Sequence, residues 1–171
     1  MVYFVGAGTG AADLITVRGM RLLQKADVII YAGSLVNPEL LDYARESCEI
    51  YNSAKMTLEE VIHVIEKAEA EGKTTVRLHT GDPCIYGAIR EQMDILDEKN
   101  ITYDYCPGVS AFCGAASALN LEYTLPNGQK VKFLDDQKTY LGNQLESEFG
   151  GDSCFGILAS MDFILVCTYA V

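Results

Sequence analysis

Three glycine-bearing segments contain the residues best suited to hold a ligand, and each follows a short apolar run. They occupy positions 5–10, 78–87 and 106–116. Each pattern is typical of a strand, a tight turn and a helix. Turns of this kind gather at the carboxyl ends of parallel strands, where open α/β sheets bind their ligands. The spacing therefore predicts one shared crevice.

The first segment reads Val-Gly-Ala-Gly-Thr-Gly and could bring bare backbone against a substrate. Its third glycine comes one residue too early for the dinucleotide pattern G-x-G-x-x-G. No acidic residue follows the next apolar run, which ends at Tyr31, so a nicotinamide site is disfavoured. A tight turn without a ligand and a close approach to a substrate both stay open.

The second segment places Asp82 and exposed backbone groups after a strand, where they could bind the amino-acid part of a ligand. Asp82 could instead cap the helix that follows. His79 could serve as a base, but a packed strand residue is the commoner role. Cys84 has no basic neighbour in the sequence that would activate a thiolate. In the third segment, Ser110 is expected to cap a helix, with or without a ligand contact.

Residues 1–126 alternate between strand and helix patterns. Strands are expected at 2–5, 26–31, 49–51, 74–78 and 102–106, and helices at 17–25, 38–46, 58–71, 85–98 and 110–119. Asn37 before proline and the capping box from Thr57 to Glu60 mark two helix starts. The predicted class is α/β, a mostly parallel open sheet of five strands with helices on both faces.

Composition narrows the range of functions. The chain has 171 residues, of which 49% are hydrophobic, and a net charge of −11, which disfavours nucleic acid and a polybasic membrane contact. Six cysteines without a C-x-x-C pair and only two histidines do not favour a metal site. No secretory signal is recognisable, so a cytoplasmic protein with reduced thiols is expected.

The alternation of strand and helix patterns stops after Pro126. Residues 127–153 are polar with turn signals, and 155–171 are apolar except for Asp162 and a few hydroxyls. One or two strands are expected in the apolar run, which is short for a membrane span and carries an acidic residue near its middle.

Five motifs taken in order resemble the tetrapyrrole methyltransferases of cobalamin synthesis. The motifs lie at 5–16, 26–36, 78–87, 107–110 and 122–126. Thr9 stands where the family pattern has proline. The resemblance implies an N-terminal α/β domain over 1–122, then a hinge and a truncated or divergent remnant of a second domain over 123–171.

The resemblance also implies a C-methyltransferase that uses S-adenosylmethionine as donor and a corrinoid precursor as acceptor. By motif, the donor contacts would be Thr80, Gly81, Asp82, Ile85, Ser110 and Ala111. The residues that face the bound tetrapyrrole would be Gly6, Gly8, Thr9 and Gly10. No catalytic residue is implied, and complete relatives are expected to be homodimers. Candidate bases for the carboxylates of the acceptor are Arg18, Arg21, Lys55, Arg77 and Arg90.

Two alternatives stay open. Nothing after Pro126 looks like the family's second domain, so the chain could be truncated, misread at a frameshift or divergent. It would then be a remnant that binds only a ligand or a partner, and we expect the chain on its own to methylate poorly. The other alternative is a methyltransferase of the same superfamily with a different acceptor.

Overall fold

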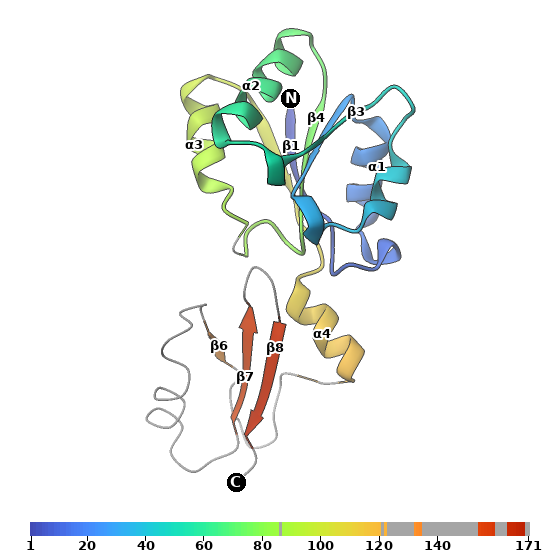
Figure 1. Cartoon of the computed structure of the whole chain (residues 1–171), viewed down its shortest axis with the longest axis vertical. Helices are drawn as coiled ribbons and strands as arrows, with labels where there is room; N and C mark the ends of the chain where they lie inside the picture. The colour runs from blue at the N-terminus through green and yellow to red at the C-terminus, as the bar shows by residue number, and fades with distance from the viewer. Residues whose placement is uncertain (86, 121, 123–131, 135–153, 160–163, 170–171) are drawn as a thin grey trace. The chain divides into compact units, whose positions relative to one another are not determined.

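The computed structural model describes residues 1–85, 87–120, 122, 132–134, 154–159 and 164–169. The chain divides into two compact units, Met1–Ala111 and Phe112–Val171. Each unit is described by itself (Figure 1). Of the polar stretch predicted at 127–153, only 132–134 lie within the described residues.

The first unit is built on a five-stranded sheet. Its strands are β1 (Val2–Gly6), β2 (Val28–Tyr31), β3 (Glu49–Asn52), β4 (Thr75–His79) and β5 (Tyr103–Cys106). They follow the order β3-β2-β4-β1-β5, and every neighbouring pair is parallel. The predicted parallel sheet is therefore confirmed. The three strands that lead into the glycine-bearing segments are neighbours, with β1 between β4 and β5.

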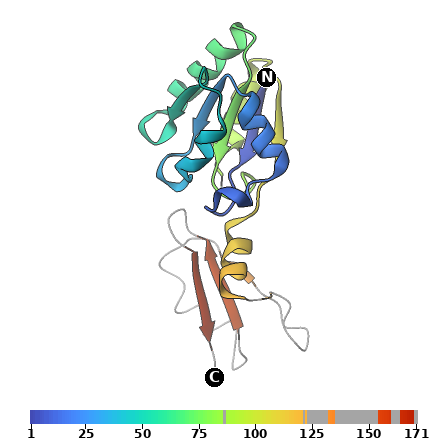
Figure 2. The ribbon, with the colours of Figure 1, turned by 90° about the vertical axis from the view of Figure 1, so that its right-hand side faces the viewer.

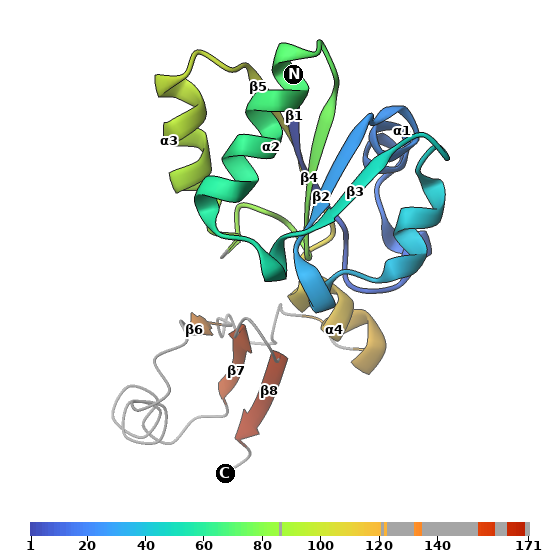
Figure 3. The ribbon, with the colours of Figure 1, turned by 45° about the horizontal axis from the view of Figure 1, so that its top comes forward.

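Helices cover both faces of this sheet, as expected. The α-helices are α1 (Val17–Lys25), α2 (Leu58–Ala70) and α3 (Arg90–Glu98), and the 3-10 helices are η1 (Ala12–Leu14), η2 (Gly33–Leu35), η3 (Pro38–Tyr43) and η4 (Ser53–Lys55). Figures 1 and 3 show α2 and α3 on one side of the strands and α1 on the other. In Figure 2 the blue helix α1 lies in front of the sheet.

The helix starts follow local sequence signals. The Thr57 side chain accepts from the backbone N–H of Glu60, whose carboxylate accepts from the backbone N–H of Thr57, so the predicted capping box is confirmed. Thr16 caps α1 in the same way through the N–H of Gly19 at 3.1 Å. The predicted helix at 38–46 is shorter, a 3-10 helix that ends at Tyr43.

Alternate strand residues point into two separate cores. Phe4 and Ile30 pack with the apolar face of α2 on one side of the sheet. Val5 and Ile29 pack with Leu23 of α1 on the other side. All five of these side chains are buried, so both sheet faces are covered, which is typical of parallel sheets.

The predicted helix at 85–98 is wrong in its first turn, because α3 begins at Arg90. The backbone at Ala88 has a φ of +48°, which an α-helix cannot contain. Gly87 lies so close to Pro83 that an added Cβ would be 2.1 Å from the Pro83 carbonyl oxygen. The four-residue apolar spacing of Ile85 and Ile89 is helical in period, but the structure has a turn at 83–85 and no helix at 87–89.

Helix α4 (Ala111–Leu119) begins at the last residue of the first unit, and its other residues belong to the second unit. The second unit also contains the strands β6 (Lys132–Leu134), β7 (Cys154–Ala159) and β8 (Ile164–Tyr169). β6 pairs parallel with β7, and β7 pairs antiparallel with β8. The helix expected at 110–119 and the strands expected in the apolar run are confirmed. Among the described residues, no helix combines the length and apolar character needed to cross a membrane.

Candidate functional site

The candidate site lies where β1, β4 and β5 end, which we call the carboxyl edge of the sheet. Gly8 and Gly81 form an isolated antiparallel bridge, with Gly81 N–H donating to Gly8 O at 2.8 Å and Gly8 N–H donating to Gly81 O at 3.2 Å. Both glycines have positive φ, +81° and +59°, which favours glycine. The first two glycine-bearing segments are thus joined through their backbones.

The third segment joins the same point. A Cβ on Gly6 would be 2.5 Å from Gly108 Cα and 2.5 Å from Gly81 O, so no side chain fits between these three backbones. A Cβ on Gly81 would be 3.3 Å from the Ala111 nitrogen and 3.8 Å from Ser110 Cα. The sequence-predicted donor residues therefore lie on adjoining segments: Thr80, Gly81 and Asp82 follow β4, and Ser110 precedes α4, which begins at Ala111. Ile85 lies in the turn that follows Asp82.

The Asp82 carboxylate connects two of these turns. Its Oδ1 accepts from the Cys84 backbone N–H at 2.9 Å and from the Tyr105 hydroxyl. Its Oδ2 accepts from the Gly108 N–H at 3.1 Å. The capping role that the sequence allowed for Asp82 is not seen, because α3 begins eight residues later. Asp82 instead holds the start of the second segment against the third.

Two buried polar atoms at the end of β4 have no hydrogen-bond partner among the described residues. They are Nε2 of His79 and Oγ1 of Thr80. Buried polar groups are almost always satisfied, so each unpaired atom requires an explanation. Burial lowers the pKa of His79 to about 3, with a smaller contribution from the Arg77 charge, so the imidazole is neutral at physiological pH. With a pKa this low, the His79 imidazole is a poor general base, which is the catalytic role that the sequence left open for it.

The remaining predicted residues border this centre. Ile85 is 37% exposed, and its N–H donates to Asp82 O at 3.0 Å. Thr9 is half-buried and Gly10 is exposed. The hydrogen bond to Asp82 raises the pKa of the exposed Cys84 thiol, so this cysteine is not an activated nucleophile.

Arg77, one of the predicted bases for the substrate carboxylates, is buried away from the surface. Arg77 is only 6% exposed, and its guanidinium donates to Gln92 Oε1 at 3.0 Å and to Ile30 O at 3.1 Å. Burial lowers the pKa of Arg77 to about 10. It stabilises the interface with α3 and cannot meet a substrate carboxylate at the surface. The exposed Arg90 pairs with Asp94 on its own helix.

Two residues at this edge were missed as site residues by sequence reasoning. Asn37 was expected only as a helix cap, and it does accept from Glu39 N–H at 3.0 Å, but it also donates to Gly10 O at 2.8 Å. Tyr105 was expected only as a strand residue. No spacing in the sequence signals that its hydroxyl reaches Asp82.

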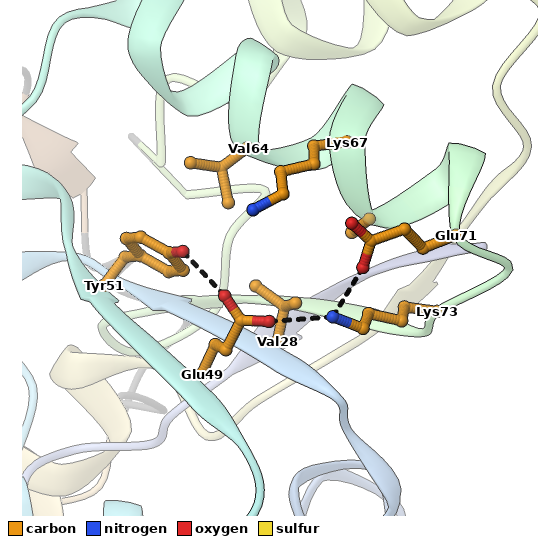
Figure 4. Close-up of a pocket in the computed structure, with 8 residues that line it drawn as sticks. Val28, Glu49, Tyr51, Val64, Lys67, Glu71 and Lys73 are labelled. Carbon is orange, nitrogen blue, oxygen red and sulfur yellow. Dashed lines mark hydrogen bonds and ion pairs between the residues drawn. The ribbon is translucent and has the colours of Figure 1, made fainter.

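A small hollow lies where β2 and β3 begin and where the chain enters β4, which we call the amino edge (Figure 4). Its charges are matched within the protein. Lys73 donates to Glu49 at 2.8 Å and to Glu71 at 2.6 Å, and Tyr51 donates to Glu49 at 2.9 Å. The ammonium of Lys73 lowers the pKa of Glu49. This hollow is an ion-pair network, and it contains none of the predicted site residues.

The fold agrees with the comparisons with known proteins. The model of the tetrapyrrole (corrin/porphyrin) methylases matches residues 1–150, and the chain belongs to this family. The resemblance expected from the five motifs is confirmed.

Three relatives show how far the similarity extends. The chain is 55% identical over 125 residues to cobalt-precorrin-4 C(11)-methyltransferase of Methanocaldococcus jannaschii, which covers 73% of this chain and 48% of that protein. It is 48% identical over 125 residues to precorrin-4 C(11)-methyltransferase of Mycobacterium tuberculosis, covering 73% of this chain and 50% of that protein. The structure of a cobalt precorrin-4 methyltransferase superposes with a TM-score of 0.81 and 38% identity, over 92% of this chain and 67% of that one.

The chain spans about half the length of the curated relatives it matches. A structure of uroporphyrin-III C-methyltransferase from Thermus thermophilus, in complex with S-adenosylhomocysteine, superposes with a TM-score of 0.66 and 26% identity. It covers 91% of this chain and 68% of that one.

Proposed function

We propose that this chain carries the donor-binding part of an S-adenosylmethionine-dependent C-methyltransferase that methylates C11 of precorrin-4 or cobalt-precorrin-4. The acceptor and position come from the names of the two curated relatives, and the donor from the Thermus complex. The observation that carries the proposal is the buried Thr80 hydroxyl, which has no hydrogen-bond partner among the described residues and lies beside the bridged Gly81.

The residues of the carboxyl edge fit the amino-acid part of such a donor. Within the hydrogen bonds of the described residues, Asp82 has one acceptor position left on Oδ2, which suits an ammonium group. Thr80 offers a hydroxyl, and the closely packed backbones at Gly81, Ser110 and Ala111 offer a surface without bulky side chains. Ile85 contributes exposed apolar area. We propose these six residues as donor contacts, and Gly6, Gly8, Thr9 and Gly10 as the side that faces the tetrapyrrole.

Methyl transfer requires little acid–base help from the protein. The donor supplies a methyl group on a sulfonium; an electron-rich ring carbon attacks it, the S–CH3 bond breaks, and sulfur keeps the electron pair. Holding donor and acceptor in line is the main task, and ideal orientation contributes about 7–11 kcal/mol. A rigid, backbone-built edge is suited to this task. The neutral His79 and the unactivated Cys84 agree with a site without a protein nucleophile.

Thr80→Val tests the donor site. The change removes the hydroxyl without breaking any hydrogen bond within the described residues, so the free energy of unfolding should stay the same or rise. Affinity for S-adenosylhomocysteine, measured by titration calorimetry, should fall about tenfold, the equivalent of about 1.4 kcal/mol for one hydrogen bond.

Thr75→Val is the matched control, since Thr75 is buried at the start of the same strand. It should leave donor affinity unchanged. A chain that does not bind S-adenosylhomocysteine, or equal affinity in the Thr80 variant, would contradict the donor site. Incubation with labelled donor and cobalt-precorrin-4 or precorrin-4 then tests transfer, and binding without transfer would favour a binding role alone.

A further inference from the structure

We propose that Tyr105 is a positioning residue of the donor site: its hydroxyl fixes the Asp82 carboxylate, and Asp82 in turn fixes the turn that carries Thr80 and Gly81. This inference rests on the proposed function. Tyr105 is the second to last residue of β5, and Asp82 lies beyond the end of β4, so the contact spans the position of β1 between them.

The hydrogen bonds around Asp82 show why its orientation matters. Oδ1 accepts two of them, from the Tyr105 hydroxyl and the Cys84 N–H, and Oδ2 accepts one, from Gly108 N–H. A carboxylate has about four acceptor positions, so one stays available on Oδ2. The three hydrogen-bond donors determine where this last lone pair points. Two of them are backbone amides, and the third is the Tyr105 side chain.

Tyr105 also acts on the turn directly. Its hydroxyl oxygen lies 3.2 Å from the Cys84 nitrogen and accepts from that N–H, which Asp82 Oδ1 shares. The hydroxyl, the carboxylate and the Cys84 amide thus form a closed three-membered cluster. In the described part of the chain, loss of the hydroxyl leaves the Cys84 and Gly108 amides and the Cys84 thiol as the hydrogen-bond donors to Asp82. The carboxylate then loses its one link to β5 and gains rotational freedom.

The affinity for a methyl donor bound at this edge depends on how firmly the Asp82 carboxylate is held in one orientation. A hydrogen-bond acceptor that is already aligned loses less conformational entropy when the ligand binds. Tyr105 need not touch the donor for this effect. We therefore expect its removal to weaken donor binding without a matching loss of overall stability.

Tyr105→Phe removes a single oxygen and keeps the ring. The chain offers a matched control two residues earlier on the same strand, because the Tyr103 hydroxyl donates to Asp97 at 3.1 Å, away from the glycine turns. Affinity for S-adenosylhomocysteine should fall about five- to tenfold in Tyr105→Phe and stay unchanged in Tyr103→Phe. Urea midpoints of the two variants should agree with each other.

Two further measurements separate positioning from direct contact. Amide hydrogen exchange without ligand should speed up at Cys84 in Tyr105→Phe and not in Tyr103→Phe. In a double-mutant cycle with Asp82→Asn, the two losses of affinity should not add, because Tyr105 acts through Asp82.

Unchanged affinity together with unchanged exchange in Tyr105→Phe would overturn the inference, and so would fully additive losses in the cycle. If the unaltered chain fails to bind S-adenosylhomocysteine, the proposed function fails instead. The exchange comparison would still decide whether Tyr105 holds the turn.

Discussion

The two edges of the parallel sheet in the first unit satisfy their polar groups in different ways. At the amino edge, charged side chains pair with one another: Lys73 with Glu49 and Glu71, and the N-terminal ammonium with Glu69. At the carboxyl edge, backbone lies against backbone and side chains are largely excluded. There the polar atoms of His79 and Thr80 are buried without a partner in the described part of the chain.

This difference separates a stabilising edge from a binding edge. A buried polar atom without a partner costs about 1–3 kcal/mol, and a protein gains nothing from keeping one unless a ligand or water completes it. Ion pairs at a surface carry no such cost. The small hollow at the amino edge is therefore the weaker candidate for a site, and the tightly closed carboxyl edge is the stronger one.

The largest effect is expected from a methyl group added where the backbones meet. A Cβ on Gly108 would be 2.1 Å from the Gly81 carbonyl oxygen, and backbone cannot move aside as a flexible side chain can. Gly108→Ala should lower the free energy of unfolding by about 3 kcal/mol, the upper part of the range for overpacking. Urea denaturation of the variant and the unaltered chain measures this loss of unfolding free energy.

Gly72→Ala is the control at the amino edge, just before Lys73. Gly72 has a φ of +67° but open space around its Cβ position. Only the cost of the left-handed conformation applies, about 1 kcal/mol. Equal losses in the two variants would mean that the three turns are not packed as tightly as the distances indicate.

The buried His79 at the carboxyl edge should make the free energy of unfolding depend on pH. Its folded-state pKa of about 3 lies below the ordinary value of 6.5, so the unfolded chain binds the proton first as the pH falls. Stability present above pH 6.5 is therefore lost progressively down to about pH 3. Between pH 7 and pH 5 the loss is about 2 kcal/mol.

Urea titrations at several pH values test this prediction. His79→Gln should flatten the curve between pH 7 and pH 5. His63→Gln provides the control, because His63 lies exposed on α2. A curve that keeps its slope in His79→Gln, or loses it in His63→Gln, would remove His79 as the source.

Much of the fold follows from local sequence. Continuous apolar runs predict buried parallel strands, and the capping box at Thr57 places the start of α2 correctly. The meeting of the three glycine-bearing segments also follows, because parallel strands place their carboxyl ends at one edge.

What sequence could not predict depends on contacts between distant residues. Apolar spacing extended α3 back to position 85, but the positive φ at Ala88 ends the helical pattern at that point. Arg77 was a candidate base for the carboxylates of the acceptor, because a strand buried on both faces shows no alternation that would mark an inward position. The contact of Tyr105 with Asp82 joins residues 23 positions apart, which no local pattern encodes.

The smallest effect is expected at the amino edge and tests the other half of the comparison. Lys73→Met removes both ion pairs with Glu49 and Glu71, yet the lysine side chain is one-third exposed and its partners more so. Exposed pairs contribute little, since water and salt screen them. The melting temperature should stay within error of the unaltered chain, and the pKa of Glu49 should rise toward its ordinary value.

The contrasting variant is Arg77→Met. It leaves Gln92 Oε1 without its buried hydrogen-bond donor and should lower the melting temperature clearly. If Lys73→Met destabilised the chain as much as Arg77→Met, the charges of the amino edge would carry the fold, and the division between a stabilising surface network and a binding edge would have to be redrawn.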